Sequence, residues 1–349
     1  MSNKMKVAVM EGIGKIGYTT REIPTPKNDE VLVKIQYVGI CGSDLHYYET
    51  GRIGDYIVEP PFVLGHEASG VVTKLGKDVK DLKLGDRVAL EPGATCGKCE
   101  FCTTGRYNLC SEVVFFATPP VDGVFQEFAA HPASLCFKLP DSVDSMNGAL
   151  IEPLAVGFHA AIQGDAHIGQ KAIVFGAGCI GLMTLLALQS LGVNNITVVD
   201  ILPNRLKQAK KMGATQVVNS LDKDFMAQFD KITDNKGFDI AFETAGTEIT
   251  TRLCIQALKK GSNLVCVGYS KTGEMTLPMS LLLDKELTIK TVFRYRHIYP
   301  LAIEAVASGK INPSDVVTNI FEFDDVQNAM DQSVDDKANI VKSVVKIQD

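Results

Sequence analysis

The sequence predicts an α/β protein in which a doubly wound parallel sheet is joined to a separate β-rich domain. The chain has 349 residues, which is more than one hydrophobic core usually holds. The first 150 residues contain short or alternating apolar runs that glycine and proline separate, which is typical of β-structure. After Gly169, six short apolar runs alternate with helical patterns, which is typical of a parallel sheet covered by helices.

The β-rich part is expected at the start of the chain. Residues 31–38 (VLVKIQYV) alternate apolar and polar side chains, and residues 70–75 and 87–90 are shorter β-type runs. No strong helical period precedes about Asn147. Residues 148–162 (GALIEPLAVGFHAAI) then predict an apolar helix with a kink or break at Pro153.

The parallel sheet is expected to use the apolar runs at residues 172–175, 196–199, 216–218, 240–242, 264–267 and 287–292. Helices are expected between these strands, for example at 179–191 and at 203–212, where Pro203 and Gly213 mark the two ends. Beyond about Arg294, the sequence predicts helices at 300–308 and 325–333 and a last strand at 340–347. This tail does not continue the alternation of strands and helices, so we expect it to return to the first domain. The expected domains are a β-rich domain of residues 1–153 and 295–349, and a parallel-sheet domain of residues 154–294.

The composition excludes several classes of protein. With 46% apolar residues and a net charge of −6, the chain is too apolar to be disordered, and it lacks the basic surface that nucleic acid or an acidic membrane requires. Residues 172–188 are apolar except for Thr184, but glycines interrupt them and they are short for a bilayer. The start, MSNKMKVAVM, does not resemble a signal peptide. We therefore expect a cytoplasmic protein, in which nine cysteines indicate metal ligands or core residues rather than disulfides.

A glycine-rich turn predicts a Rossmann-type dinucleotide site. Residues 171–175 form an expected strand, and G-x-G-x-x-G follows with its glycines at Gly176, Gly178 and Gly181. These suit a tight turn, a close approach to a pyrophosphate and helix–strand packing. Asp200 ends the next strand, where a carboxylate can accept from the ribose 2′-hydroxyl. Because Ile201 follows rather than a basic residue, NAD is preferred over NADP; Arg205 is a further candidate for the adenosine ribose.

Four closely spaced cysteines predict a metal site that is closed to substrate. Cys96, Cys99, Cys102 and Cys110 have the spacing C-x2-C-x2-C-x7-C. Four thiolates can complete a tetrahedron around zinc and leave no open position, so such a site would stabilise its loop. An iron–sulfur cluster is the alternative, and two disulfides are a poorer third.

A second set of candidate ligands is scattered along the chain. Cys41, His66, Glu67 and Glu152 are residue types that bind zinc, and three of them would leave a fourth position for water or substrate. Glu152 lies in an apolar segment, where a carboxylate needs a partner. Each of the four also has an ordinary structural explanation, and their spacing alone does not join them into one site.

Several segments together resemble the zinc-containing medium-chain alcohol dehydrogenase family. GHEASG (65–70), the cysteine loop and the glycine turn occur in that family's order, and the match runs nearly end to end. Three further segments resemble sorbitol, xylitol and related polyol dehydrogenases: CGSDLHYYETGRIG (41–54), ALIEPLAVGFHA (149–160) and VFRY (292–295). The resemblance implies a GroES-like first domain, two zinc ions per chain, and reversible NAD-linked oxidation of a sugar alcohol to a ketose. It also implies a homo-oligomer, with a tetramer favoured.

The resemblance assigns roles to individual residues. It implies a catalytic zinc bound by Cys41 and His66, with Glu67 or Glu152 as the carboxylate, and a structural zinc in the cysteine loop. It implies that Ser43 and His46 relay a proton and that Glu152 takes part in catalysis. The residues expected to bind substrate hydroxyls are Tyr47, Glu152, Arg294 and Tyr295. Those expected to line NAD are Gly176, Gly178, Ile180, Gly181, Asp200, Arg205, Val267, Gly268, Tyr269, Val292, Phe293 and Arg294.

Three other functions remain open from the sequence. L-threonine 3-dehydrogenases share both zinc patterns, but Tyr47 and residues 293–295 favour a polyol. A sugar-alcohol-phosphate dehydrogenase would need a basic cluster beyond Arg52, Arg294 and Arg296. A non-enzymatic NAD-binding protein is the remote third alternative, because such a protein should have lost the ligands of the catalytic zinc.

Overall fold

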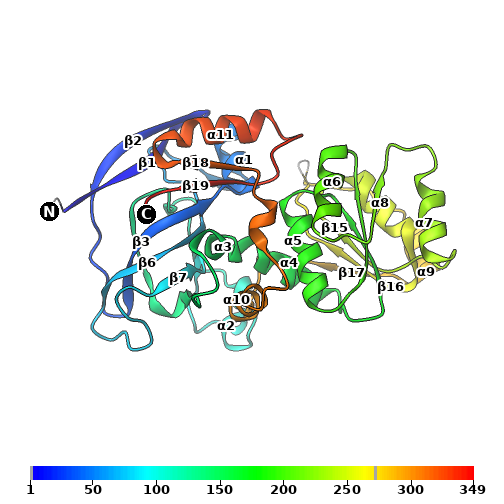
Figure 1. The fold of residues 1–349 in the computed structure, drawn as a ribbon, viewed down its shortest axis with the longest axis horizontal. Helices are drawn as coiled ribbons and strands as arrows, with labels where there is room; N and C mark the ends of the chain where they lie inside the picture. The colour runs from blue at the N-terminus through cyan, green and yellow to red at the C-terminus, as the bar shows by residue number, and fades with distance from the viewer. Residues whose placement is uncertain (1–2, 271–272) are drawn as a thin grey trace. The chain divides into compact units, whose positions relative to one another are not determined.

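A computed structural model describes residues 3–270 and 273–349 (Figure 1). Contacts divide the chain into a first unit, Met1–Glu152, Tyr299–Gly309 and Val317–Asp349, and a second unit, Pro153–Ile298 and Lys310–Val316. The expected domain limits therefore need correction at Pro153, at 295–298 and at 310–316. The segment 310–316 belongs to the second unit because its short helix η3 (Pro313–Val316) contacts α5 (Cys179–Ser190), and the Gln208 amide donates to the carbonyl of Asp315.

The first unit is built on a seven-stranded sheet with the order β11-β7-β6-β3-β19-β18, and β10 also pairs with β3. These strands are β3 (Glu30–Gly39), β6 (Glu67–Leu75), β7 (Arg87–Leu90), β10 (Phe128–Pro132), β11 (Cys136–Lys138), β18 (Asn319–Glu322) and β19 (Ser343–Lys346). In β19, Val345 lies opposite Val38 of β3, so the tail of the chain returns to this sheet. The β-rich character expected of the first domain is thus present.

Shorter elements complete the first unit. Its two-stranded sheets pair β1 (Lys4–Gly12) with β2 (Lys15–Glu22), β4 (Arg52–Ile53) with β5 (Tyr56–Ile57), and β8 (Gly93–Ala94) with β9 (Val114–Phe115). Its α-helices are α1 (Gly42–Thr50), α2 (Glu100–Thr103), α3 (Ser145–Ala149), α10 (Tyr299–Ala307) and α11 (Val326–Asp335). Its 3-10 helices are η1 (Tyr107–Leu109), η2 (Ala133–Leu135) and η4 (Phe323–Asp325).

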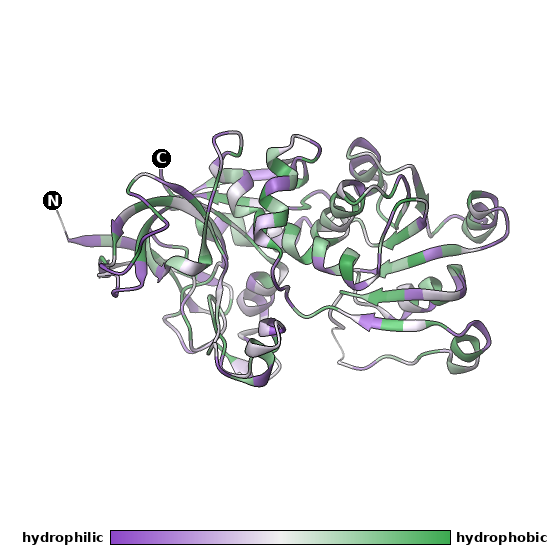
Figure 2. Ribbon diagram, turned by 90° about the horizontal axis from the view of Figure 1, so that it is seen from below, coloured by the Kyte–Doolittle hydropathy of each residue, from purple (hydrophilic) through white to green (hydrophobic). Residues whose placement is uncertain are grey.

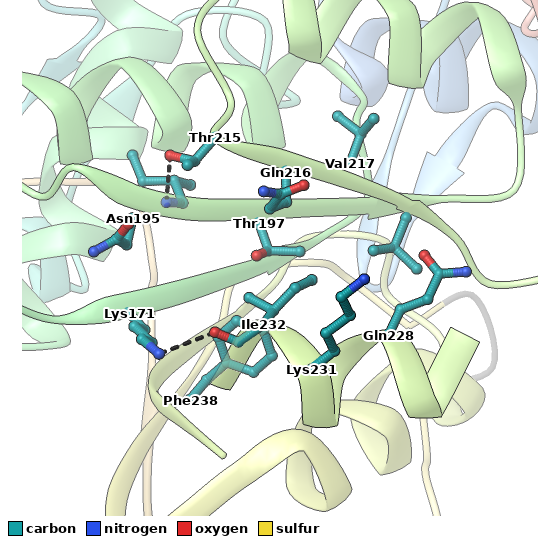
Figure 3. Close-up of a pocket in the computed structure, with 12 residues that line it drawn as sticks. Lys171, Asn195, Thr197, Thr215, Gln216, Val217, Gln228, Lys231, Ile232 and Phe238 are labelled. Carbon is teal, nitrogen blue, oxygen red and sulfur yellow. Dashed lines mark hydrogen bonds between the residues drawn. The ribbon is translucent and has the colours of Figure 1, made fainter. Parts of the chain in front are cut away.

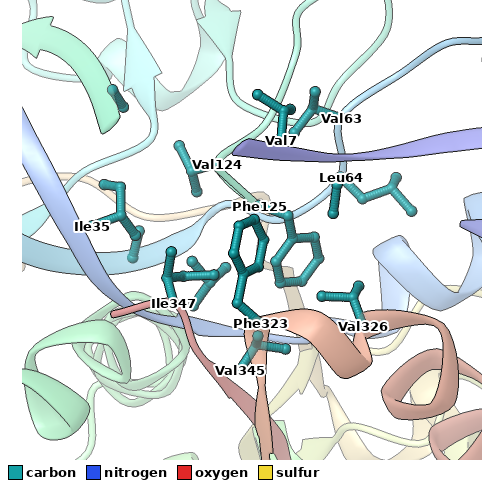
Figure 4. Close-up of a cluster of buried hydrophobic side chains, with 14 of the residues drawn as sticks. Val7, Ile35, Val63, Leu64, Val124, Phe125, Phe323, Val326, Val345 and Ile347 are labelled. Atoms are coloured by element: carbon teal, nitrogen blue, oxygen red, sulfur yellow. The ribbon is translucent and has the colours of Figure 1, made fainter. Parts of the chain in front are cut away.

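One hydrophobic cluster holds distant segments of the first unit together. Val7, Ile35, Phe125, Phe323 and Val345 are all buried and belong to this cluster (Figure 4). They come from the beginning, the middle and the end of the chain, and burial of large apolar side chains is the main favourable contribution to folding. One core cluster of the first unit therefore joins segments from both ends of its discontinuous sequence.

The second unit contains a six-stranded parallel sheet with the order β14-β13-β12-β15-β16-β17. Its strands are β12 (Lys171–Phe175), β13 (Asn195–Asp200), β14 (Gln216–Asn219), β15 (Phe238–Glu243), β16 (Leu258–Cys266) and β17 (Thr288–Thr291). Its helices, besides α5 and η3, are α4 (Ile151–Gln163), α6 (Pro203–Lys211), α7 (Phe225–Thr233), α8 (Glu248–Ala257) and α9 (Met279–Lys285). Strands of this sheet are mostly hydrophobic in Figure 2, as a sheet covered on both faces requires. The predicted doubly wound sheet is confirmed.

Two local expectations were wrong. The structure has helices before Asn147, among them α1 and α2. The sequence pattern did not show α1 because its buried residues include Asp44 and give no apolar stripe. The helix expected at 148–162 is interrupted at Leu150, between α3 and α4. Pro153 therefore lies in the first turn of α4, where its missing N–H removes no intrahelical hydrogen bond.

The apolar stretch 172–188 is divided between β12, the glycine turn at 176–178 and residues 179–188 of α5. In the part of the chain that the structure describes, no helix combines the length and apolarity needed to cross a bilayer.

Candidate active site and metal centres

The glycine turn between β12 and α5 has the close contacts that its sequence predicted. Gly176 has a φ of +99°, in the left-handed region that favours glycine. A Cβ on Gly181 would lie 1.8 Å from the carbonyl oxygen of Gly176, so helix and turn approach each other only without a side chain there. A Cβ on Gly178 would meet only Arg205 Nη1, at 3.8 Å, so the backbone at Gly178 remains approachable. Ile180 is half-buried in the first turn of α5.

Asp200 is held against this turn at the end of β13. Its Oδ2 accepts a hydrogen bond from the backbone N–H of Ala177 (2.7 Å), and its Oδ1 accepts from Ile201 (2.8 Å) and Leu202 (2.9 Å). The carboxylate therefore connects two strand ends and stays half-exposed. Its contact with a ribose remains a prediction, and so does the contact expected of Arg205.

Replacing Asp200 with alanine is expected to raise the KM for NAD by about tenfold or more, because one charge-assisted hydrogen bond to a ribose contributes about 1.5–3 kcal/mol. Steady-state rates measured at varied NAD test this expectation. Lys207→Ala, on the exposed side of α6, is the control and should leave KM unchanged. An unchanged KM in the Asp200 variant would remove the ribose role.

The remaining residues expected to line NAD follow two other strands at the same edge of the sheet. Val267, Gly268 and Tyr269 come directly after β16, and Val292, Phe293 and Arg294 come after β17. The Val292 N–H donates to the carbonyl of Cys266 (3.0 Å). Ligands of doubly wound proteins bind beyond the carboxyl ends of parallel strands, and the structure brings these segments to that edge.

Arg294 and Tyr295 lie in a constrained segment. Arg294 has a φ of +54°, which is uncommon for a residue with a side chain, and its guanidinium carbon lies 4.8 Å from the centroid of the Phe293 ring. Tyr295 is buried. Residues held in sparsely populated conformations often lie at functional sites, so this segment is a candidate for ligand contact.

A groove of about 610 Å³ lies elsewhere in the second unit (Figure 3). Its lining includes Lys171 and Asn195, which begin β12 and β13, and Lys231 of α7. It therefore opens at the amino ends of the strands and contains none of the predicted site residues. We assign no function to it.

In the first unit, the structure brings the four predicted cysteines together. Ligand atoms of Cys96, Cys99, Cys102 and Cys110 all lie within 4.8 Å of one another, and the sulfurs of Cys96 and Cys102 are 3.9 Å apart. Sulfurs at the corners of a zinc tetrahedron are about 3.8 Å apart, given a Zn–S distance of about 2.3 Å. Backbone N–H groups of Lys98 and Cys99 lower the pKa of Cys96 to about 7, which favours the thiolate. The donor set fits a tetrahedral zinc ion.

Replacing Cys110 with serine is expected to lower the zinc content by one ion per chain and to lower the melting temperature, because a bound structural metal contributes its binding free energy to folding. Metal analysis and thermal unfolding measure the two effects, and any loss of activity should follow loss of fold. Cys254→Ala, a buried cysteine outside both metal groups, is the control for zinc content. A Cys110 variant that keeps its full zinc content would contradict the assignment.

A second cluster joins Cys41, His66 and Glu67, whose ligand atoms also lie within 4.8 Å of one another. Cys41 is the residue before α1, and Glu67 begins β6 directly after His66. His66 and Glu67 are buried, whereas Cys41 is half-buried. A Cβ on Gly39 would lie 2.1 Å from Glu67 Oε2, so the carboxylate occupies the space that this glycine leaves. One thiolate, one imidazole and one carboxylate fit a zinc ion with an open fourth position.

Asp44 orients two members of this cluster, and the sequence reasoning missed it. Its carboxylate accepts from the N–H groups of Cys41 and Gly65 (2.9 Å each), and its Oδ1 lies 3.6 Å from His66 Nδ1. Burial alone would lower the pKa of His66, but the charges of Asp44 and Cys41 raise it well above its ordinary value. A carboxylate facing one ring nitrogen leaves the other nitrogen for a metal. Its position three residues after the N-cap, as in a capping box, was the available signal.

Lys342 is the second functional candidate that the sequence reasoning missed. This buried lysine from the β18–β19 connection donates to Glu67 Oε1 (2.6 Å) and to the carbonyl of Ile40 (2.8 Å), and it forms an ion pair with Glu67 Oε2. The two charges neutralise each other beside the proposed metal position. The signal was a lysine within the apolar run IVKSVV, where a charged side chain needs a partner.

Other predicted residues lie near this cluster or at its margins. α1 carries Ser43, His46 and Tyr47, and the spacing of three and four residues from Ser43 places them on neighbouring parts of one helix face. Ser43 and His46 are half-buried, and Tyr47 is buried. Glu152, at the start of α4, is buried but lies outside both metal-ligand groups. Burial raises the pKa of the Glu91 carboxyl group to about 7, and the negative charge of Glu152 adds to this rise.

Comparison with known proteins decides the family. The alcohol dehydrogenase GroES-like domain matches residues 27–141, and the zinc-binding dehydrogenase domain matches residues 179–308. The chain belongs to the zinc-type medium-chain alcohol dehydrogenase family. This confirms the resemblance and the GroES-like and Rossmann-type fold classes inferred from the sequence.

Individual relatives cover the chain nearly end to end. It is 42% identical to a sorbitol dehydrogenase of Bacillus subtilis over 98% of this chain and 97% of that one. It is 44% identical to an uncharacterised zinc-type alcohol dehydrogenase-like protein of Escherichia coli, over 99% and 100% of the two chains. The solved structure of L-idonate 5-dehydrogenase from Escherichia coli has a TM-score of 0.91 and 32% identity, covering 99% of this chain and 98% of that one.

Proposed function

We propose that this zinc-type dehydrogenase oxidises a secondary alcohol of a sugar alcohol, of the sorbitol, xylitol or iditol type, reversibly to a ketose with NAD as acceptor. The observation that carries the proposal is the cluster of half-buried Cys41 with buried His66 and Glu67, supported by Asp44. Its three ligands suit a zinc ion that keeps a position open for substrate. Similarity to a sorbitol dehydrogenase over nearly the whole chain supports the substrate class.

Residues of the first unit are proposed to transfer the proton of the alcohol. When bound, zinc supplies Lewis-acid polarisation of the alcohol oxygen, and NAD accepts the hydride. Ser43 is proposed to accept the alcohol proton at its hydroxyl oxygen and to pass it to His46, one helical turn further along α1. His46 is half-buried, and its ring nitrogen is proposed to release the proton to water.

Hydrogen bonding is proposed to select polyols over simple alcohols. Tyr47 and Glu152 are buried polar groups of the first unit, and a hydroxyl and a carboxylate can each bond to a substrate hydroxyl that a simple alcohol lacks. The substrate contacts expected of Arg294 and Tyr295 remain predictions from the resemblance. Which carboxylate, Glu67 or Glu152, completes the zinc shell is also part of the proposal, and the observed clustering favours Glu67.

NAD is proposed over NADP because the end of β13 offers an anion, Asp200, and then an exposed apolar residue, Ile201. A 2′-phosphate would meet the carboxylate and find no adjacent cation at Ile201. Two zinc ions per chain, one in each cluster, complete the proposed composition. The resemblance further supports a cytoplasmic homo-oligomer, with a tetramer favoured.

The test of the proposed function is a panel of substrates at fixed zinc content. NADH formation is followed with pentitols, hexitols, L-threonine, a sugar-alcohol phosphate and ethanol, and with NADP in place of NAD. We expect kcat/KM for the best polyol to exceed that for L-threonine, the sugar-alcohol phosphate or ethanol by at least about 100-fold. This ratio corresponds to a difference of about 2.7 kcal/mol in activation free energy. If L-threonine or the sugar-alcohol phosphate is oxidised fastest, the proposed polyol substrate class is wrong. NADH binding without turnover of any substrate would indicate a non-enzymatic NAD-binding protein.

A further inference from the structure

Glu243, the last residue of β15, has no role in the function proposed above. It is 1% exposed, and burial raises the pKa of its carboxyl group. Its Oε1 accepts hydrogen bonds from the N–H groups of Ala245 and Gly246 (3.0 Å each) and from the hydroxyl of Thr250 (2.7 Å). Among residues 3–270 and 273–349, no lysine, arginine or histidine forms an ion pair with it.

The backbone of Glu243 holds the end of the neighbouring strand. Its carbonyl oxygen accepts from the N–H groups of Val267 (2.8 Å) and Gly268 (3.1 Å), directly after β16. One residue therefore bonds the turn 244–247 through its side chain and the turn 267–269 through its backbone. The two turns also touch each other, since a Cβ on Gly268 would lie 2.2 Å from the Gly246 nitrogen.

The turn that Glu243 organises also contacts the glycine turn. The hydroxyl of Thr244 donates to the carbonyl oxygens of Phe175 (2.9 Å) and Gly176 (3.1 Å). A Cβ on Gly176 would lie 2.8 Å from that hydroxyl oxygen. Three turns at the carboxyl edge of the sheet, after β12, β15 and β16, are thus connected through Glu243 and Thr244.

A buried acid without a cationic partner is costly, so its retention needs a reason. Desolvation of a carboxylate opposes folding, and hydrogen bonds from neutral donors offset this only in part. An apolar side chain could fill the same space in a sheet whose other central residues are apolar. What an apolar side chain cannot do is accept hydrogen bonds from the N–H groups of Ala245 and Gly246 and from the Thr250 hydroxyl at once.

We infer that Glu243 is a positioning residue for the dinucleotide, whose carboxylate and backbone hold the turns 244–247 and 267–269 in register with the glycine turn. The inference rests on the proposed function only in taking NAD as the ligand. Glu243 is buried behind these turns and acts through them. Its effect should therefore be on nucleotide affinity, with little effect on the chemical step.

The test compares Glu243→Gln with the wild-type zinc-loaded enzyme. Glutamine can keep its oxygen at the Oε1 position, but its amide N–H₂ then replaces Oε2, which also accepts from the Gly246 N–H (3.1 Å). An N–H group would then face an N–H group, so the turn 244–247, and with it the contact of Gly246 with Gly268, should lose its fixed position. We expect the Kd for NADH, measured by fluorescence of the bound dinucleotide, to rise at least tenfold. The KM for NAD should rise equally, while kcat at saturating NAD should stay within about threefold.

Two variants on α8 separate positioning from general destabilisation. Thr250→Val removes one donor to the Glu243 carboxylate, and we expect a smaller rise in Kd, about threefold. Thr251→Val removes a buried hydroxyl of the same helix that bonds to the Thr247 carbonyl and not to Glu243, so Kd should not change. If Glu243→Gln does not fold, the pair of threonine variants decides the question.

The inference is overturned if Glu243→Gln binds NADH with the wild-type Kd. It is also overturned if Thr251→Val weakens NADH binding as much as Thr250→Val, because both would then report only a loosened helix. The Kd for NADH is measured without a polyol. A wild-type enzyme that binds NADH but oxidises no sugar alcohol would therefore refute the proposed function, while the Kd values of the variants would still test the role of Glu243.

Discussion

Replacing Cys41 with serine is expected to lower kcat/KM for polyol oxidation by at least about 1000-fold and to remove one zinc ion per chain. The thiolate is one of three ligands in the Cys41–His66–Glu67 cluster, and a serine hydroxyl is a far weaker zinc ligand at neutral pH. The fold should survive, because Cys41 is the N-cap of α1 and serine is a preferred N-cap residue. Zinc analysis and steady-state rates on the same preparation measure both effects.

The matched control for this experiment is Cys136→Ala. Cys136 is a buried cysteine of β11 in the same unit and belongs to neither metal group. Its loss should change neither the zinc content nor kcat/KM by more than about twofold. A Cys41→Ser enzyme that keeps its zinc and most of its activity would show that the catalytic metal lies elsewhere.

Replacing Lys342 with methionine is expected to lower the free energy of unfolding by about 3 kcal/mol or more. The buried ammonium neutralises the carboxylate of Glu67 and donates to the carbonyl of Ile40, and both would lose a partner away from water. Removal of one member of a buried ion pair typically costs about 3–5 kcal/mol. Denaturant unfolding of the zinc-free protein measures this effect without the contribution of the metal.

A double variant identifies the cause of that loss. Glu67→Gln combined with Lys342→Met removes both charges, so it should be more stable than Lys342→Met alone, although Glu67→Gln by itself is destabilising. Lys337→Met provides the control, since this lysine pairs with Glu49 at an exposed position and its loss should cost less than about 1 kcal/mol. A double variant no more stable than Lys342→Met would show that the ion pair does not explain the cost.

The parallel sheet could be predicted from the sequence because its inner strands β12, β13 and β15 are buried on both faces. Such strands are short continuous apolar runs, and Gly176 and Gly181 identify the turn by close contacts that no other residue allows. The cysteine loop was predictable for a similar reason, since all four ligands lie within fifteen residues and chain geometry brings them together.

The second metal cluster could not be built from spacing, because its geometry comes from tertiary contacts. Cys41 and His66 meet only because Gly39 of β3 pairs with Glu67 of β6, which sets the ends of both strands side by side. Lys342 reaches the cluster from the other side of β3, through its pairing with β19. These pairings join residues up to about 300 positions apart, and no local pattern encodes them.

α1 and the segment 310–316 show two further limits of local reasoning. α1 buries an acid and two tyrosines, Asp44, Tyr47 and Tyr48, so the usual apolar stripe of a helix is absent. The segment 310–316 has no strong pattern of its own, and its place in the second unit depends on contacts with α5 and Gln208. In both cases tertiary interactions outweigh the local signal.

The most direct measurement is anomalous scattering at the zinc absorption edge from crystals of the active enzyme. The account predicts a peak about 2.0–2.3 Å from the sulfur of Cys41, from a ring nitrogen of His66 and from a carboxylate oxygen, with a second peak among the four cysteines. Crystals that oxidise sugar alcohols with NAD but show no peak between Cys41 and His66 would contradict it.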